Sequence, residues 1–284
     1  VKMLNLKNAN KELIGDLSNK ENLVIPKNTK KELRILINKN KDFLIIIEEN
    51  AELDLITNFE VNEDSKISFE IILKENAKLN YLNLQNLSLN IKYNEEKRVK
   101  LEKNSEFNYY DLNFGSKSIK SELIVNLDGE NAKFEHYGIF VSDKKQEFDF
   151  GVNASHNAPY TYSNMLTKGV LCDSSKSNYR GLIKISKNAH NSNGYQKEDV
   201  ILLSNDAEAN VIPKLEIDNH DVRCTHGASI SQLDQDKIFY LMTRGLDENQ
   251  AKIELVNGFF QIILNKINFD NIEKIQGIIQ DKIK

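Results

Sequence analysis

Cysteine and proline are scarce in this chain of 284 residues, and tryptophan is absent. The two cysteines, Cys172 and Cys224, are too few for a disulfide framework, which favours a reducing compartment such as the cytoplasm. The longest apolar run, residues 43–47, is far shorter than the roughly 20 residues that span a bilayer. The N-terminal residues lack the apolar core of a secretory signal. We therefore expect a cytoplasmic protein with no membrane segment.

Several catalytic motifs are also missing. The sequence contains no GxxxxGK[ST] phosphate loop, no G-x-S-x-G elbow, and neither a CxxC nor an HExxH zinc pattern. These absences argue against an ATPase, an acyl hydrolase or a zinc protease, and we expect the chain itself not to be an enzyme. The net charge of −4 is spread over mixed acidic and basic residues without a basic stripe, which argues against a nucleic-acid partner.

Alternating apolar and polar residues dominate the first two-thirds of the chain, for example in residues 51–57, 66–73 and 77–84. Such alternation predicts half-buried β-strands. Between the strands, a five-residue pattern recurs: a charged residue, Asn, a small residue, a charged residue and an apolar residue. It occurs at residues 49–53, 75–79, 103–107 and 130–134, with weaker echoes at 187–189 and 205–207.

The spacing of this pattern predicts the architecture. Its small residues, at positions 51, 77, 105 and 132, follow one another at intervals of 26, 28 and 27 residues. A period of this length is typical of a solenoid, in which each turn buries its apolar face on the next. Asn tolerates the left-handed conformation of a tight corner. We expect the small residue to fit inside that corner and the apolar residue to face the interior.

An antiparallel sandwich with Asn-rich hairpins is the alternative, because turn signals also recur about every 8–12 residues. The longer period favours a β-solenoid over residues 1–230.

A small α-helical domain is expected over residues 231–284. Asp234, Asp247 and Asp270 are candidate N-caps of three helices, and Gly245 is a candidate C-cap of the first. Apolar residues recur at helical spacing, namely Ile238, Leu241 and Met242, then Ala251, Leu255, Val256, Phe259, Phe260 and Ile263, then Ile272, Ile275, Ile279 and Ile283. These faces must pack on the body of the protein or on a partner, and periodicity alone favours neither.

Residues 215–228 combine a thiol, two imidazoles and several carboxylates. In a strand, Cys224 and His226 point to the same face, and Glu216 shares their parity. Thiolate and imidazole together suit iron or zinc. The alternative is that Cys224 is a small buried apolar residue and His226 a hydrogen-bonded turn residue. The residues alone favour this alternative.

The same region resembles the SufB/SufD family of iron–sulfur cluster assembly proteins. The similar sequence motifs occur in family-like order and spacing. They are YRGLI at 179–183, LLSNDA at 202–207, IPKLEI at 212–217, DVRCTHGAS at 221–229 and FYLMTRG at 239–245. Upstream, His156, Ser163 and residues 169–171 resemble the family's entry into this region. The first 150 residues resemble the family only in being rich in strands.

This resemblance implies a mainly β fold, a right-handed parallel β-helix followed by a helical C-terminal domain. It implies a scaffold on which nascent clusters are built and a dimer formed through the β-helix. A separate SufC-like ABC-type ATPase is expected to dock on the C-terminal helices. We expect its contacts to include Phe239, Tyr240, Arg244, Phe259 and Phe260. By the same resemblance, Cys224 and His226 are expected to hold a transient iron–sulfur cluster, with Glu216 a weaker candidate on the same strand face.

The chain is similar to the D-type members of the family. Gly227 follows the motif histidine where B-type members have Glu, and residues 196–199 lack the B-type cysteine. Its length resembles that of the compact, single-scaffold version called SmsB. The resemblance leaves open a homodimer or a heterodimer with a SufB-like scaffold.

Two other functions remain as alternatives. One is a β-solenoid that acts on carbohydrate, with Asp218 and Asp221 as paired carboxylates. These two residues have opposite strand parity and no aromatic platform beside them. The other is a purely structural solenoid without a cluster. This alternative gives the Cys-x-His motif no role.

Overall fold

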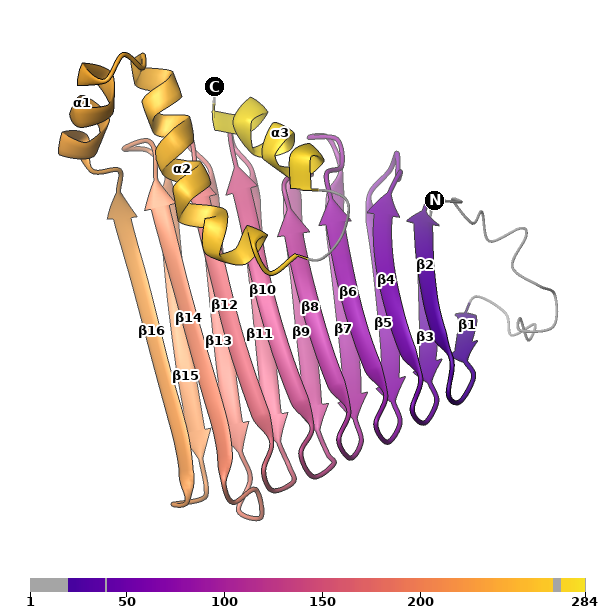
Figure 1. The fold of residues 1–284 in the computed structure, drawn as a ribbon. Coiled ribbons are helices and arrows are strands. Elements are labelled where there is room, and N and C mark those ends of the chain that lie inside the picture. The colour runs from indigo at the N-terminus through magenta and orange to yellow at the C-terminus, as the bar shows by residue number, and fades with distance from the viewer. Residues whose placement is uncertain (1–19, 39, 268–271, 284) are drawn as a thin grey trace.

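The computed structural model describes residues 20–38, 40–267 and 272–283. Within these residues the chain forms strands β1 to β16 and then helices α1 to α3. Each strand pairs in parallel with the strands two places before and after it in the sequence, which gives two sheets (Figure 1). The predicted parallel β-helix is therefore confirmed, and the antiparallel sandwich is excluded.

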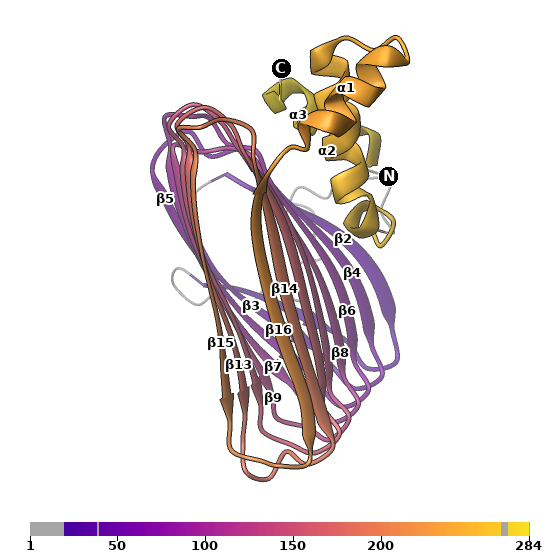
Figure 2. The same cartoon turned by 90° about the vertical axis from the view of Figure 1, so that its left-hand side faces the viewer.

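Odd-numbered and even-numbered strands form separate sheets. The first sheet contains β1 (Lys20–Ile25), β3 (Lys41–Ile47), β5 (Ser65–Leu73), β7 (Lys92–Leu101), β9 (Ser118–Leu127), β11 (Glu147–His156), β13 (Lys176–Ile185) and β15 (Glu208–Ile217). The second contains β2 (Lys30–Ile37), β4 (Glu52–Phe59), β6 (Lys78–Gln85), β8 (Glu106–Asn113), β10 (Lys133–Ser142), β12 (Tyr162–Leu171), β14 (Ser192–Leu202) and β16 (Val222–Gln232). Figure 2 looks along the stack and shows the two sheets facing each other.

The recurring five-residue pattern forms one corner of the solenoid. Its asparagines Asn50, Asn76, Asn104 and Asn131 have φ values of 57°, 58°, 56° and 60°, in the left-handed region. Their side chains form a ladder, in which Asn76 Nδ2 donates to Asn50 Oδ1 at 2.9 Å and Asn104 Nδ2 donates to Asn76 Oδ1 at 3.0 Å. The small and apolar residues that follow are buried, namely Ala51, Ala77, Ser105 and Ala132, and Leu53, Leu79, Phe107 and Phe134. The predicted role of each position is confirmed.

Later turns of the solenoid are longer. Stacked corner asparagines are 22 to 28 residues apart along the ladder, whereas stacked side chains near the C-terminal end are up to 32 residues apart. Tyr160 and Asn191 also adopt left-handed conformations, with φ values of 59° and 56°. The first of the two weak echoes of the pattern, residues 187–189, lies at the same kind of corner. Ala189 is buried shortly before β14, as Ala132 is buried just before β10. Residues 205–207 instead form the opposite corner, between β14 and β15.

Apolar side chains fill most of the interior. In β5, for example, Ile67, Phe69 and Ile71 are at most 1% exposed, and the residues between them face outward. Stacking repeats this arrangement from turn to turn, so that one elongated core runs along the solenoid. Full burial of one such side chain contributes about 1.5–3 kcal/mol.

Three helices follow the last strand: α1 (Gln235–Thr243), α2 (Glu248–Leu264) and α3 (Ile272–Ile283). Asp234 accepts hydrogen bonds from the first turn of α1, and Asp247 forms a capping box with Gln250 at the start of α2. Gly245 follows α1 with φ 98°. These three predicted caps are confirmed, while Asp270 lies outside the described residues.

Helices α2 and α3 lie on the outer face of the second sheet (Figure 2). Phe260, Ile263, Ile275 and Ile279 are completely buried in a second apolar cluster, together with outward-facing residues of the sheet such as Ile139. Lys282 of α3 forms an ion pair with Asp143. The body of the protein therefore covers these two apolar faces. Among the described residues, no helix is long and apolar enough to cross a membrane.

Candidate functional site

The Cys-x-His motif, Cys224 and His226, lies on β16, the last strand of the second sheet. In the described chain β16 pairs only with β14, so its outer edge is unpaired. Glu216 lies on β15, in the other sheet, and a turn at residues 218–221 separates the two strands. The expectation that Glu216 shares a strand face with Cys224 is therefore wrong, because the chain changes sheets between them.

Cys224 occupies an inward-facing position at this open end. It pairs with the buried Gly194 of β14 and packs against the core, yet it remains partly accessible. Burial raises the pKa of the Cys224 thiol, and a backbone hydrogen bond from Gly194 acts in the opposite direction. Loss of the thiol proton is easier when a cation is bound to the sulfur.

His226 has the same strand parity as Cys224 and pairs with the buried Gln196. Its side chain is exposed, because no further turn of the described chain stacks on β16. Cys224 and His226 thus occupy adjacent inward-facing positions of one strand, as the parity argument predicted. The alternative interpretation of His226 as a turn residue is wrong, since it lies within β16.

Glu216 is exposed, and its carboxylate lies 3.6 Å from the Lys184 ammonium. Among the described residues, no three His, Cys, Asp or Glu side chains are arranged to hold a metal ion. Asp218 and Asp221, the pair considered for carbohydrate chemistry, are exposed residues of the turn before β16.

The residues expected to contact a partner fall into two groups. Phe239 and Tyr240 of α1 are 68% and 55% exposed. The Arg244 guanidinium lies 5.2 Å from the Tyr240 ring centroid and donates a hydrogen bond to its hydroxyl at 3.1 Å. In contrast, Phe260 is completely buried, and Phe259 packs under the Lys168 ammonium, 3.9 Å from its ring centroid. While α2 stays on the sheet, Phe260 is closed to a partner and Phe259 is only partly accessible, whereas the α1 group is exposed.

Sequence reasoning missed a set of polar side chains inside the solenoid. Glu95 and Lys97 of β7 form an ion pair in which both side chains are only 1% exposed. Burial raises the pKa of Glu95, although Lys97 acts against this. Strand parity could have revealed this pair. Glu95 and Lys97 alternate with outward-facing residues in the same way as Tyr93 and Val99, which are buried in the interior of the same strand.

A second buried carboxyl lies close to the open end. Glu198 of β14 is 2% exposed, and neither of its carboxyl oxygens has a hydrogen-bond partner among the described residues. Burial raises the pKa of Glu198 to about 9. It pairs with Ala228, two residues after His226.

The fold and this end of the molecule define a class: a two-sheet parallel β-solenoid with a Cys-x-His pair on its exposed last strand and a helical appendage on one face. Residues 33–259 match the family described as SUF system FeS cluster assembly, SufBD core domain. The chain therefore belongs to the SufBD family of iron–sulfur cluster assembly proteins, and the resemblance to SufB and SufD is confirmed.

Curated relatives support this assignment. The chain is 32% identical over 211 residues to an iron–sulfur cluster assembly SufBD family protein of Mycobacterium bovis, which covers 74% of this chain and 25% of that protein. It is 28% identical over 234 residues to a SufBD family protein of Synechocystis, which covers 80% of this chain and 49% of that protein. The chain thus spans between a quarter and a half of the length of these relatives.

Proposed function

We propose that this chain is a non-enzymatic scaffold on which iron–sulfur clusters are assembled before transfer to other proteins. Membership of the SufBD family carries the proposal, and the position of Cys224 supports it. Cys224 is a half-buried, inward-facing thiol at an open end, with His226 two residues further on. Cysteine thiolates are the usual ligands of iron–sulfur clusters, and imidazole can complete such a site.

Within this proposal, Cys224 and His226 bind the cluster, which is the cargo of the scaffold. Glu216 is a weaker candidate, because its carboxylate lies on the neighbouring sheet and is engaged by Lys184. Two donors from one chain do not complete the four-cysteine ligand set of a typical cluster. A second scaffold chain at the same end would supply further donors.

The proposed dimer forms through this open end. In the part of the chain that the structure describes, the outer edges of β15 and β16 carry unpaired backbone groups, and exposed edges favour pairing with another strand. Ile217 and Ile230 on these strands are 42% and 46% exposed. The second chain is another copy of this scaffold or a SufB-like scaffold.

The proposed partner of the helical appendage is a SufC-like ABC-type ATPase. The exposed side chains of Phe239 and Tyr240 on α1, with that of Arg244 just after the helix, offer the contact surface. Hydrolysis of ATP by this partner would supply the work that loads or releases the cluster, since the scaffold itself lacks a phosphate-binding loop.

Anaerobic reconstitution with iron and sulfide tests the cluster site. The wild-type protein and Cys172→Ser should acquire the visible charge-transfer absorbance of a bound cluster, while Cys224→Ser and His226→Ala should lose most of it. Cys172→Ser is the matched control, because Cys172 is buried under the helices, away from β16. Equal cluster content in Cys224→Ser and the wild type would contradict the ligand assignment.

Light scattering tests the dimer. The purified chain should be dimeric alone or with a SufB-like scaffold, and Ile230→Lys on β16 should weaken the association. Leu36→Lys is the matched control, because Leu36 is an apolar residue, 37% exposed, on the strand at the opposite end of the same sheet. A monomer under both conditions would count against the proposal.

A further inference from the structure

A line of side chains on the outer face of the second sheet connects the last strand to helix α2. Lys168 of β12, Asp199 of β14 and Ser229 of β16 occupy paired positions of three neighbouring strands. Ser229 Oγ donates to Asp199 Oδ1 at 2.7 Å, and Asp199 Oδ2 lies 3.4 Å from the Lys168 ammonium. Phe259 of α2 covers the same ammonium, which lies 3.9 Å from its ring centroid. These four residues are called the latch below.

The ion pair at the centre of the latch is largely shielded from solvent, since the side chains of Lys168 and Asp199 are each 12% exposed. Burial acts to raise the pKa of Asp199, but the hydrogen bond from Ser229 and the ammonium groups of Lys197 and Lys168 hold it below its usual range. The carboxylate is therefore charged at neutral pH. Hydrogen bonds to a charged acceptor are stronger than those between neutral groups, so the bond from Ser229 contributes to the attachment of β16.

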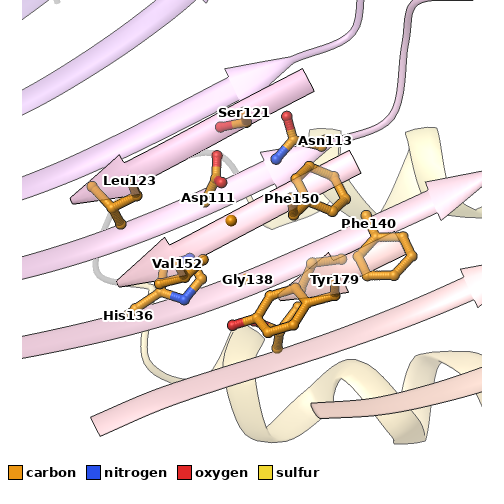
Figure 3. Close-up of a pocket in the computed structure, with 13 residues that line it drawn as sticks. Asp111, Asn113, Ser121, Leu123, His136, Gly138, Phe140, Phe150, Val152 and Tyr179 are labelled. Atoms are coloured by element: carbon orange, nitrogen blue, oxygen red, sulfur yellow. The ribbon is translucent and has the colours of Figure 1, made fainter. Parts of the chain in front are cut away.

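The strands behind the latch form a packed base. Thr167, next to Lys168 on β12, lines a small interior cavity together with residues such as Gly138 and Tyr179 (Figure 3). This cavity has room for about one water molecule, so it offers little space for β12 to shift. In the described chain β16 pairs with β14 on one side only. It is therefore the strand of the latch that can open locally.

We infer that the latch couples the packing of α2 on the second sheet to the attachment of β16. The Phe259 ring holds the ammonium of Lys168 in place. The ammonium binds one oxygen of Asp199 and so orients the other towards Ser229. If α2 leaves the sheet, the ammonium loses its contact with the ring and the carboxylate is held less firmly. The hydrogen bond from Ser229 is then weaker, and β16 opens more often.

The consequence for the scaffold rests on the proposed function. β16 carries Cys224 and His226 at inward-facing positions, whereas Ser229 lies on its outer face. Helix α2 packs against α1, the helix proposed to bind the ATPase, and contacts β10 and β12. An ATPase that draws α1 and α2 away from the sheet would therefore loosen the strand that carries the proposed ligands. Asp199 and Ser229 are positioning residues, because they act on the site through the position of β16.

Hydrogen exchange of the β16 amides, measured by mass spectrometry, tests the coupling. A double-mutant cycle compares the wild type, Phe259→Leu, Ser229→Ala and the double variant, all in the same oligomeric state by light scattering. Ser229→Ala should speed exchange in β16 about tenfold, because a hydrogen bond to a charged group is lost. Phe259→Leu keeps an apolar side chain over the sheet but removes the ring, and should speed exchange in β16 about threefold. In the Ser229→Ala background it should have almost no effect, because the connection to β16 is already cut.

Two controls separate the latch from a general loss of stability. Ser229→Thr keeps the hydroxyl group, so its β16 amides should exchange as in the wild type. The amides of β5, near the opposite end of the solenoid, should exchange at the same rate in all variants. Unchanged β16 exchange in Phe259→Leu, or an equal acceleration in both backgrounds, would overturn the coupling. Neither result involves a cluster or the ATPase, so a failed reconstitution or co-purification would count against the proposed function alone.

Discussion

The sulfur atom of Cys224 lies 3.5 Å from the position that a Cβ atom would take at Gly194, directly across the β14–β16 pair. The same Cβ atom would lie 2.8 Å from a methyl carbon of Ile183. A Cβ atom at this position would therefore clash with Ile183 of the facing sheet, while its distance to the sulfur is an ordinary van der Waals contact. Cys224 is half-buried although it lies on the last strand, because its side chain faces inward and packs against the core.

The first prediction concerns the reactivity of the two cysteines. In the monomeric chain, where no second chain covers β16, Cys224 should react with a thiol reagent much faster than Cys172, because Cys172 is 8% exposed and burial raises its pKa to about 12. Mass spectrometry after timed alkylation measures both sites in one sample. In Cys224→Ser only slow labelling should remain. Similar labelling rates at the two cysteines would show that β16 or the helices pack differently.

The second prediction concerns the asparagine ladder. Asn76→Ala should lower the free energy of unfolding by about 2 kcal/mol, because it loses two ladder hydrogen bonds and forces alanine into a left-handed conformation. Asn76→Gly should cost about 1 kcal/mol, since glycine adopts this conformation without strain. Chemical denaturation measures both. Equal losses in the two variants would mean that backbone strain contributes nothing at this corner.

The architecture could be predicted because the early turns are regular. The pattern around Asn50, Asn76, Asn104 and Asn131 assigns the same conformation to the same corner four times. The helix caps at Asp234 and Asp247 could also be predicted from the sequence, because a cap needs only local hydrogen bonds. Where the turns lengthen, Tyr160 takes the left-handed position, and nothing in a tyrosine signals that conformation.

The candidate site could be predicted only in part. Parity placed Cys224 and His226 correctly, because both lie within one strand. Glu216 was misplaced, since parity counting assumed one strand where the chain turns between two sheets. The buried Phe260 could not be distinguished from an exposed contact, because helical periodicity identifies an apolar face and not what covers it.

The third prediction concerns the partner surface. Phe239→Asp on α1 should abolish co-purification with the SufC-like ATPase and leave the thermal stability of the scaffold nearly unchanged, because Phe239 is 68% exposed. Ile262→Asp on α2 is the matched control, since Ile262 is 56% exposed on a different helix, and it should retain the ATPase. Phe260→Asp should instead destabilise the fold by more than about 3 kcal/mol. Full ATPase binding by Phe239→Asp would place the contact elsewhere.

The fourth prediction concerns acid stability. Burial lowers the pKa of His156 to about 4 from its ordinary value of 6.5. An unfolded chain therefore takes up a proton at this residue below pH 6.5, whereas the folded chain does so only near pH 4. The contribution of neutral His156 is fully present above pH 6.5 and is lost as the pH falls towards 4. Each such histidine steepens the loss of stability by up to about 1.4 kcal/mol per pH unit.

His156→Gln should remove this contribution, because glutamine can bond to Thr161 and Ser163 but does not titrate. Its free energy of unfolding, measured by denaturation between pH 4 and 7, should fall less steeply than that of the wild type. Part of the acid dependence should remain, since the pKa of buried His136 is also lowered to about 4. Thr161→Val is the control: it removes a hydrogen bond at 2.8 Å and keeps the titrating ring, so its curve should be lower but as steep. If His156→Gln gave the wild-type slope, His156 would have to be charged or exposed in the folded protein near pH 6, contrary to its burial at the end of β11 beside Thr161.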